Sequence, residues 1–176
     1  MVDKYRPKVN LVYFSEKGVG CVFRKSIKIA AYDKIISQDM DLSTDLNFIP
    51  KAIGLLDSND VVIGSKKMGS QERSTIRKIP STVFIFLVRL LLGLPYKDYS
   101  MAAKAYKKSA VSKYLGRIDY GSSYVIDLIY FIKKNGGKLI EIPVSCHDKR
   151  KSKFNIFHES IYRFKNLVTL FFQHFL

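Results

Sequence analysis

Residues 34–65, KIISQDMDLSTDLNFIPKAIGLLDSNDVVIGS, contain the pattern that decides the fold class. The short run at 34–37 predicts a buried strand, and the run VVI at 61–63 predicts another. Between them, residues 46–56 have helical spacing, with Pro50 where the first turn of a helix tolerates it. Strands and helices that alternate at this spacing predict an α/β layered fold with a largely parallel sheet. Ligands of such folds bind beyond the C-terminal ends of the strands.

The segments on either side of this stretch continue the alternation. Residues 9–14, VNLVYF, predict a strand, and the turn KGVG leads into a helix with Val22 and Ile27 on its apolar side. Further along the chain, the pattern predicts a basic loop at 66–78, an apolar helix at 83–92 that Gly93-Leu94-Pro95 ends, a helix at 123–133, an edge strand at 138–144 that contains Pro143, a basic loop at 147–153 and a helix at 154–176.

The composition indicates one folded domain with a strong positive charge. The 176 residues are 47% hydrophobic, enough for a core, and 30 Lys and Arg against 15 Asp and Glu give a formal charge of +15. This charge predicts anionic partners such as acidic lipid headgroups, phosphorylated substrates or nucleic acid. A nucleic-acid partner is not expected, because the aromatic residues lie in apolar runs and no nucleic-acid-binding motif is present.

Two apolar segments and two cysteines bear on the compartment. Residues 82–94 and 167–176 are shorter than the roughly 20 residues of a membrane-spanning helix. The last helix combines cations with an apolar end, which is typical of a helix at a membrane interface. Cys21 and Cys146 lie far apart and predict neither a disulfide framework nor a zinc site. No cleavable signal peptide is recognised, so we expect the chain at the cytoplasmic side of a membrane.

The pair Asp39-x-Asp41 directly follows the predicted strand at 34–37. Two carboxylates at such a loop can bind a divalent cation and link it to a diphosphate, because Mg²⁺ and Mn²⁺ prefer oxygen ligands. The motif occurs often by chance, and a solvated turn is the commoner explanation when nothing else agrees.

Seven short blocks follow one another along the chain and support this interpretation of the pair: KGVGCVFRKSIKIA, IISQDMDLS, DVVIGSKK, RSTIRKIPSTVFIFLVRLLLGL, KDYSMAAKAYKKS, GGKLIEIPV and RKSKFN. The sequence resembles, from about Val9 to Asn155, the polyprenyl-phosphate branch of the family 2 glycosyltransferases, which includes dolichyl-phosphate mannosyl- and glucosyltransferases. The resemblance implies a GT-A (Rossmann-like) fold and transfer of a hexose, with inversion, from a GDP- or UDP-sugar to a polyprenyl phosphate.

The resemblance assigns the donor side of the site. It implies that Asp39 and Asp41 bind Mg²⁺ or Mn²⁺ together with the donor diphosphate, and that the cation stabilises charge on the departing nucleotide. Ser43 stands where mannosyltransferase relatives often have a metal-binding Gln. A lipid phosphate is already an anion at neutral pH, so the acceptor needs no general base. The three histidines, His147, His158 and His174, are accordingly interpreted as surface or packing residues.

The resemblance also assigns cations to the acceptor phosphate, although each cation alone is more simply explained as a solvated surface charge. Lys66 replaces the Arg of the family's GSR block, which keeps the charge but loses the bidentate fork. Arg77 and Ser81, one helical turn apart, are the pair on which we place most weight. The predicted acceptor-phosphate residues are Lys66, Arg73, Arg77, Ser81, Arg150, Ser152 and Lys153.

Asp98 is a third predicted catalytic carboxylate, in the block KDYSMAAKAYKKS. Relatives commonly have Cys-Gly-Phe after this Asp, whereas this chain has Met101-Ala102-Ala103. Loss of the glycine matters if the backbone must approach a ligand closely. A helix-capping or salt-bridging Asp98 therefore stays open beside a sugar-binding one. Asp127 corresponds either to the family's helix acid or to an exposed helix carboxylate.

Members of the family begin with a nucleotide-binding segment that this sequence lacks before residue 9. We therefore expect an N-terminally truncated GT-A domain at 1–155, whose sheet edge is hydrophobic and unpaired, and an amphipathic interface helix at 156–176. A truncated gene model, a partner chain that supplies the missing segment and a non-catalytic remnant at the membrane surface are the alternatives. Membrane attachment is expected to be peripheral, or to use segments absent from this chain.

Overall fold

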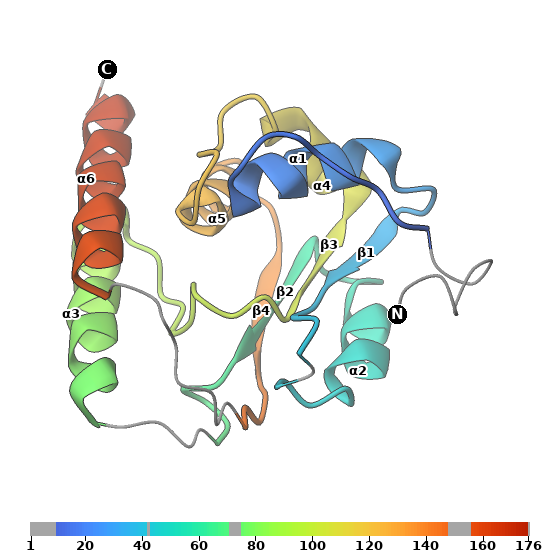
Figure 1. The fold of residues 1–176 in the computed structure, drawn as a ribbon, viewed down its shortest axis with the longest axis horizontal. Coiled ribbons are helices and arrows are strands. Elements are labelled where there is room, and N and C mark those ends of the chain that lie inside the picture. The colour runs from blue at the N-terminus through green and yellow to red at the C-terminus, as the bar shows by residue number, and fades with distance from the viewer. Residues whose placement is uncertain (1–9, 42, 71–74, 148–155, 176) are drawn as a thin grey trace.

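The structure is a computed structural model that describes residues 10–41, 43–70, 75–147 and 156–175. In these ranges helices and strands alternate along much of the chain, which confirms the predicted α/β class (Figure 1). The elements, in chain order, are α1 (Val19–Ile29), β1 (Lys34–Ser37), α2 (Phe48–Leu55), β2 (Val61–Ser65), α3 (Thr75–Leu92), β3 (Lys104–Lys107), α4 (Lys108–Val111), the 3₁₀ helix η2 (Ser112–Tyr114), α5 (Tyr124–Lys134), β4 (Leu139–Pro143) and α6 (Ile156–Phe175).

The strands of the described chain form one sheet with the order β1-β3-β2-β4. β3 is antiparallel to both β1 and β2, and only the β2–β4 pair is parallel, so the prediction of a largely parallel sheet was wrong. The error comes from β3, which sequence reasoning missed because its four residues, KAYK, contain no apolar run. β1, β2 and β4 still point the same way, and their C-terminal ends lie at one edge of the sheet.

The predicted strand at residues 9–14 is also wrong. Residues 10–14 form neither strand nor helix, and the side chains of Leu11, Val12 and Tyr13 are exposed to solvent. A strand needs a neighbour for its backbone groups, and no other described segment pairs with this one. β1 forms one edge of the sheet, and its only partner in the described chain is β3.

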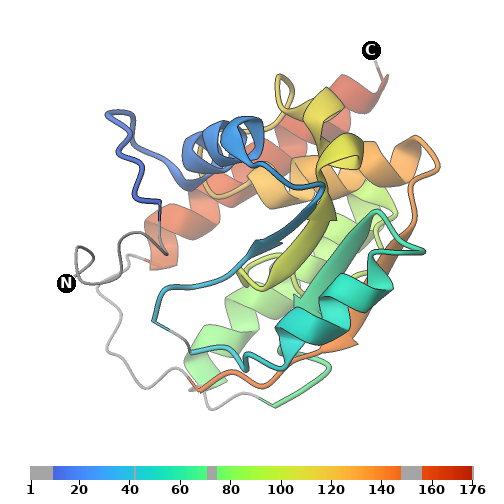
Figure 2. The same ribbon diagram turned by 90° about the vertical axis from the view of Figure 1, so that its right-hand side faces the viewer.

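Helices cover both faces of the sheet (Figures 1 and 2). Because side chains alternate along a strand, Val61 and Ile63 face the larger core, which includes residues of α1, α3, α5 and α6, whereas Val62 faces the smaller core against α2. Ala105 lies on the α2 face of β3 and Tyr106 on the other face. The central strands β2 and β3 are thereby buried on both sides and provide a rigid base for the loops at the edge of the sheet.

The helix predictions agree with the structure apart from their bounds. α3 begins at Thr75, three residues before the predicted end of the basic loop, and ends before Gly93, whose φ of 66° favours glycine. β4 is an edge strand, as Pro143 predicted. No helix in the described ranges is long and apolar enough to cross a membrane.

Candidate active site at the carboxyl ends of the strands

Three loops of the described chain meet where β1, β2 and β4 end, on the lower side of the sheet in Figure 1. The loop after β4 runs beside the loop that follows Asp39 and Asp41. The amide of Asp45 donates to the Ser145 carbonyl at 3.1 Å, and the amide of His147 donates to the Ser43 carbonyl at 2.8 Å. The loops therefore meet at the C-terminal edge of the strands, which is the edge where the sequence predicted ligand binding.

The loop after β2 packs against the same segment. The amide of Val144 donates to the Ser65 carbonyl at 3.1 Å, and the amide of Cys146 donates to the Ser70 carbonyl at 3.0 Å. Gly69 permits this approach, because a Cβ there would lie 2.4 Å from the Val144 carbonyl oxygen. The loops at 39–45 and 66–70 are thus both hydrogen-bonded to the segment at 144–147 and lie next to it.

Asp39 and Asp41 lie at the open side of this structure. Asp39 is half-buried and Asp41 is exposed, and the amide of Ser43 donates to Asp41 Oδ1 at 2.8 Å. Two carboxylates at a strand end suit Mg²⁺ or Mn²⁺, whose remaining positions would be taken by diphosphate oxygens and water. In the described ranges no three His, Cys, Asp or Glu side chains are grouped closely enough to hold a metal by themselves.

Asp98 differs from this pair because its carboxylate is enclosed by the protein and is 2% exposed. Its Oδ1 accepts hydrogen bonds from the amide and hydroxyl of Ser100, at 2.9 and 3.0 Å, and from the Met101 amide at 3.2 Å. Its Oδ2 accepts the Lys66 amide at 3.3 Å and lies 3.8 Å from the Lys66 ammonium. The salt-bridging function left open by the sequence is therefore present, whereas its catalytic role stays a prediction.

The 97–98 turn is held from the opposite side by Glu141 of β4. The Glu141 carboxylate accepts the amide of Lys97 at 2.8 and 3.0 Å and the amide of Asp98 at 2.9 Å. Sequence reasoning assigned no role to Glu141. Its signal was weak, because a single acid in the strand LIEIP suits a solvent-facing edge position equally well.

Two lysines balance the Asp98 charge. Lys66 is 6% exposed, and its ammonium donates to the Ser100 hydroxyl at 2.9 Å. Lys104, which the sequence analysis missed, is fully buried and donates to the Met101 carbonyl. Burial alone would raise the pKa of Asp98, but the ammonium groups of Lys66 and Lys104 and the hydrogen bonds from Ser100 together outweigh burial and lower it below its ordinary value. Asp98 is therefore an anion at neutral pH.

The structure places the other predicted acceptor residues only in part. Ser81 is half-buried in α3, and Arg77 lies in the first turn of that helix, where only the backbone is described. Lys66 faces Asp98 and Ser100 within the protein. Arg73, Arg150, Ser152 and Lys153 lie outside the described residues. A phosphate-binding role for these residues stays a prediction.

The interpretation of Asp127 as an exposed helix carboxylate was wrong, because this residue is only 8% exposed. Its Oδ2 accepts the Asp119 amide at 2.7 Å. Burial raises the pKa of Asp127 to about 7, although the Asp119 amide opposes this shift. Among the histidines, His147 and His158 are exposed, as expected of surface residues, and the side chain of His174 is not described.

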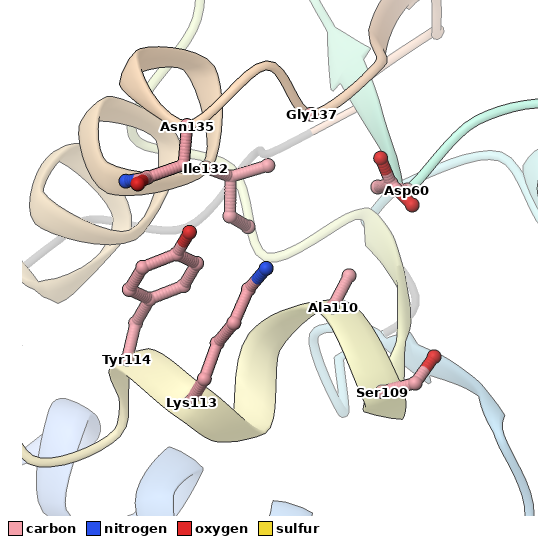
Figure 3. Close-up of a pocket in the computed structure, with 8 residues that line it drawn as sticks. All are labelled: Asp60, Ser109, Ala110, Lys113, Tyr114, Ile132, Asn135 and Gly137. Carbon is pink, nitrogen blue, oxygen red and sulfur yellow. The ribbon is translucent and has the colours of Figure 1, made fainter.

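A separate hollow of ≈ 200 Å³ lies away from these loops (Figure 3). It adjoins Asp60, which precedes β2, and therefore lies toward the other end of that strand. None of the predicted site residues lines it, so it is not the candidate site. Its lining residues are Asp60, Ser109, Ala110, Lys113, Tyr114, Ile132, Asn135 and Gly137.

Curated relatives of the chain are glycosyltransferases, although no family model matches it. The chain is 24% identical over 144 residues to glycosyltransferase AglD of Haloferax volcanii, with 79% of this chain and 23% of the relative covered. It is also 24% identical over 119 residues to the undecaprenyl-phosphate mannosyltransferase of Micrococcus luteus, with 65% and 49% covered. These relatives confirm the predicted resemblance and agree with the predicted enzyme class, and the chain spans less than half of either.

Solved structures of glucosyl-3-phosphoglycerate synthase from Mycobacterium tuberculosis have the same fold. The complex with UDP matches with a TM-score of 0.64 and 16% identity over 96% of this chain and 59% of that chain. The complex with Mn²⁺, UDP and phosphoglyceric acid matches with a TM-score of 0.68 and 13% identity over 96% and 58%. At this identity the match confirms the predicted GT-A fold.

Proposed function

We propose that this chain, which has the GT-A fold and resembles family 2 glycosyltransferases, is part of an enzyme that glycosylates a lipid phosphate. It transfers a hexose from a GDP- or UDP-sugar to a polyprenyl phosphate at the cytoplasmic face of a membrane. Residues 1–155 form the transferase part, and residues 156–176 form a helix at the membrane interface. Because the chain spans less than half of either curated relative, recognition of the nucleotide is assigned to a further segment or a partner chain.

The meeting of three loops beside Asp39 and Asp41 is the observation that carries this proposal. The hydrogen bonds of Asp45 and His147 place Ser145 and His147 beside the loop that carries the carboxylate pair, and His147 is the first residue of the predicted basic loop at 147–153. A metal–diphosphate and an acceptor phosphate could therefore occupy one site. The relative from Micrococcus luteus is named for transfer to undecaprenyl phosphate, and solved neighbours contain Mn²⁺ or Mg²⁺ with UDP.

The proposed reaction is a single displacement. An oxygen of the acceptor phosphate forms a bond to the anomeric carbon, and the bond from that carbon to the nucleotide diphosphate breaks with inversion. Mg²⁺ or Mn²⁺ on Asp39 and Asp41 supplies charge stabilisation for the leaving diphosphate. Arg77 and Ser81 hold the acceptor phosphate, and no proton has to be removed from it.

Exposed apolar residues on two helices in contact support the membrane location. α3 exposes Val83, Phe86 and Leu90, which share one helical face, and α6 exposes Ile161, Phe164 and Phe172, which share another. The two helices lie together on one side of the molecule (Figure 1). With a formal charge of +15, such a surface fits an anionic bilayer.

Transfer is tested with Mn²⁺, labelled UDP- or GDP-hexose and undecaprenyl phosphate in detergent, for this chain alone and for the chain joined to the nucleotide-binding segment of a relative. We expect metal-dependent formation of a labelled lipid in the second case. The proposal fails if the joined protein folds and binds nucleotide but forms no labelled lipid with either donor.

The alternative function, a non-catalytic protein at the membrane surface, is favoured by the same apolar helices. Sedimentation with vesicles containing phosphatidylglycerol distinguishes the two functions. The non-catalytic function is indicated if the chain binds vesicles but, alone or joined to the segment of a relative, neither binds nucleotide-sugar nor transfers hexose. The double substitution Phe86→Ser with Phe164→Ser should reduce vesicle binding at least tenfold, whereas Tyr32→Ser, at an exposed residue between α1 and β1, should not.

A further inference from the structure

Lys104 occupies a special place in the sheet. Because β3 is antiparallel and lies between β1 and β2, its first residue stands at the edge where those two strands end. Lys104 is opposite Ser37 on one side and opposite Ile63 on the other. The chain continues from Ser37 to Asp39 and from Ile63 to Lys66. Lys104 is thus placed between the two loops that carry the donor-side and acceptor-side residues.

The side chain of Lys104 contacts the 98–101 turn, and its register opposite Ser37 places it beside the end of the strand that leads to Asp39. Its side chain is 0% exposed, and its ammonium donates to the Met101 carbonyl. Burial lowers the pKa of Lys104 to about 8, and the negative charges of Asp98 and Asp39 oppose this effect. Lys66 and Arg163 act on it as like charges. The ammonium is therefore protonated at neutral pH and lies within the electrostatic reach of both carboxylates.

Among the buried charges of the described residues, the two lysines beside Asp98 carry one more charge than Asp98 neutralises. Lys66 and Lys104 contribute two buried positive charges, whereas Asp98 contributes one negative charge of similar burial. An unbalanced buried charge is costly, so a second carboxylate is needed. Asp39, which is half-buried just after the end of β1, is a second carboxylate that acts on Lys104.

We propose that Lys104 is a positioning residue that links the Asp39 loop to the Asp98 loop. It anchors the 98–101 turn through the Met101 carbonyl and holds Asp39 by charge, so that the two sides of the site keep a fixed separation. The assignment of a donor and an acceptor side rests on the proposed function, but the link itself does not. Neither the motif blocks nor the carboxylate pair assigns a role to this residue.

The test compares Lys104→Met and Lys104→Gln with Lys104→Arg in the full chain. Lys107→Met is the matched control, because Lys107 lies in the same strand but outside the cluster. Thermal unfolding first establishes that each variant is folded. Amide exchange, followed by NMR, then reports on both loops through the amides of Ser43, Ser100 and Met101, each of which donates to a carboxylate.

We expect Lys104→Met to speed exchange at least tenfold at Ser43 as well as at Ser100 and Met101. Lys104→Gln can still donate to the Met101 carbonyl, so it should protect Ser100 and Met101 but not Ser43. Lys104→Arg should restore both loops, and Lys107→Met should change neither. A carbon-13 titration of Asp98 in a neutral variant should also give a higher pKa than in the native chain.

The proposal is overturned if a folded Lys104→Met or Lys104→Gln leaves the Ser43 amide protected as in the native chain. It is also overturned if Lys104→Arg behaves like Lys104→Met, because charge would then not be what matters. None of these readouts requires sugar transfer. A chain with coupled loops but no transferase activity would refute the proposed function and leave the link intact.

Discussion

Asp98 and Asp41 belong to neighbouring loops of one site, yet their surroundings are opposite. Asp98 is 2% exposed and receives hydrogen bonds from Ser100, Met101 and the Lys66 amide. Asp41 is exposed, and its contacts include the Ser43 amide. One carboxylate is thus enclosed by the protein before any ligand arrives, whereas the other is accessible to a ligand.

This difference separates residues that are needed for folding from residues that are needed for ligand binding. Substitutions on the Asp98 side should act first on folding, because they leave buried charges without a partner. Substitutions at Asp41 should act on ligand binding and leave folding unchanged, because an exposed carboxylate contributes little to stability. Loss of activity alone cannot distinguish the two sides, so each prediction below includes a measurement of stability.

The largest effect is expected for Asp98→Ala. It leaves the ammonium groups of Lys66 and Lys104 without their buried counter-charge, and we expect a loss of about 3–5 kcal/mol in the free energy of unfolding. Urea unfolding at pH 7 measures it. Asp98→Asn keeps an oxygen for the Ser100 amide and should lose less. A change below about 1 kcal/mol for Asp98→Ala would contradict the enclosed side of the comparison.

Asp41→Ala should produce the next largest effect, on metal-dependent transfer. We expect a fall of about 100-fold in the joined protein at limiting Mn²⁺, because one of two carboxylate ligands is lost. The urea midpoint should not move. Asp45→Ala is the control, since Asp45 is an exposed acid in the same loop whose carboxylate accepts the Asn47 amide. Equal effects of the two variants would remove the metal assignment.

Asp127→Asn tests a buried carboxyl whose pKa is raised in the folded chain. The folded pKa of about 7 exceeds the ordinary 3.8, so the proton bound in the folded state contributes stability that is fully present below pH 3.8. This contribution is lost as the pH rises through 7. Asp127→Asn has no such loss, so its stability relative to the native chain should increase by about 2 kcal/mol between pH 5 and pH 8.

Urea unfolding at the two pH values measures this difference. Asparagine keeps a carbonyl oxygen for the Asp119 amide, so the hydrogen bond seen in the native chain is retained. A stability difference that is the same at pH 5 and pH 8 would show that Asp127 titrates normally. Asp98→Asn should show no such change between pH 5 and pH 8, because the pKa of Asp98 is lowered in the folded state and its contribution to stability is lost only as the pH falls below the ordinary value of 3.8.

The smallest effect is expected for the exposed ion pair between Lys34 and Asp57, whose charged atoms lie 2.5 Å apart. Its geometry is closer than that of Lys66 with Asp98, at 3.8 Å, but water screens it. Lys34→Met should leave the unfolding midpoint within the scatter of repeated curves. A clear destabilisation would mean that burial is not what separates strong from weak pairs in this protein.

Local patterns predicted much of the fold and part of the site. The helices α1, α2, α5 and α6 have strong apolar periodicity or clear end signals, and Asp39 and Asp41 follow a strand that was correctly placed. The strand at 9–14 was predicted on the same local grounds and is absent, because strand formation depends on a neighbour that the sequence pattern cannot supply. Local pattern thus identifies helices better than strand pairing.

Lys104 illustrates what the sequence could not reveal. In the sequence Ala103-Lys104-Ala105 the lysine looks like an ordinary surface residue. Its burial follows only from the placement of β3 between β1 and β2. Glu141 was missed for the same reason, since the amides that donate hydrogen bonds to its carboxylate, those of Lys97 and Asp98, are distant in sequence. Both functions depend on tertiary contacts that no local spacing encodes.

The central position of β3 also sets an order of events during synthesis. β1 and β2 leave the ribosome well before β3, and in the described sheet they are joined only through it. Until Lys107 has emerged, both strands carry backbone groups without their native partner, which is the condition that favours pairing with another nascent chain. Fragments that end before β3 should therefore aggregate, and a chaperone that protects nascent chains would have its greatest effect in that interval.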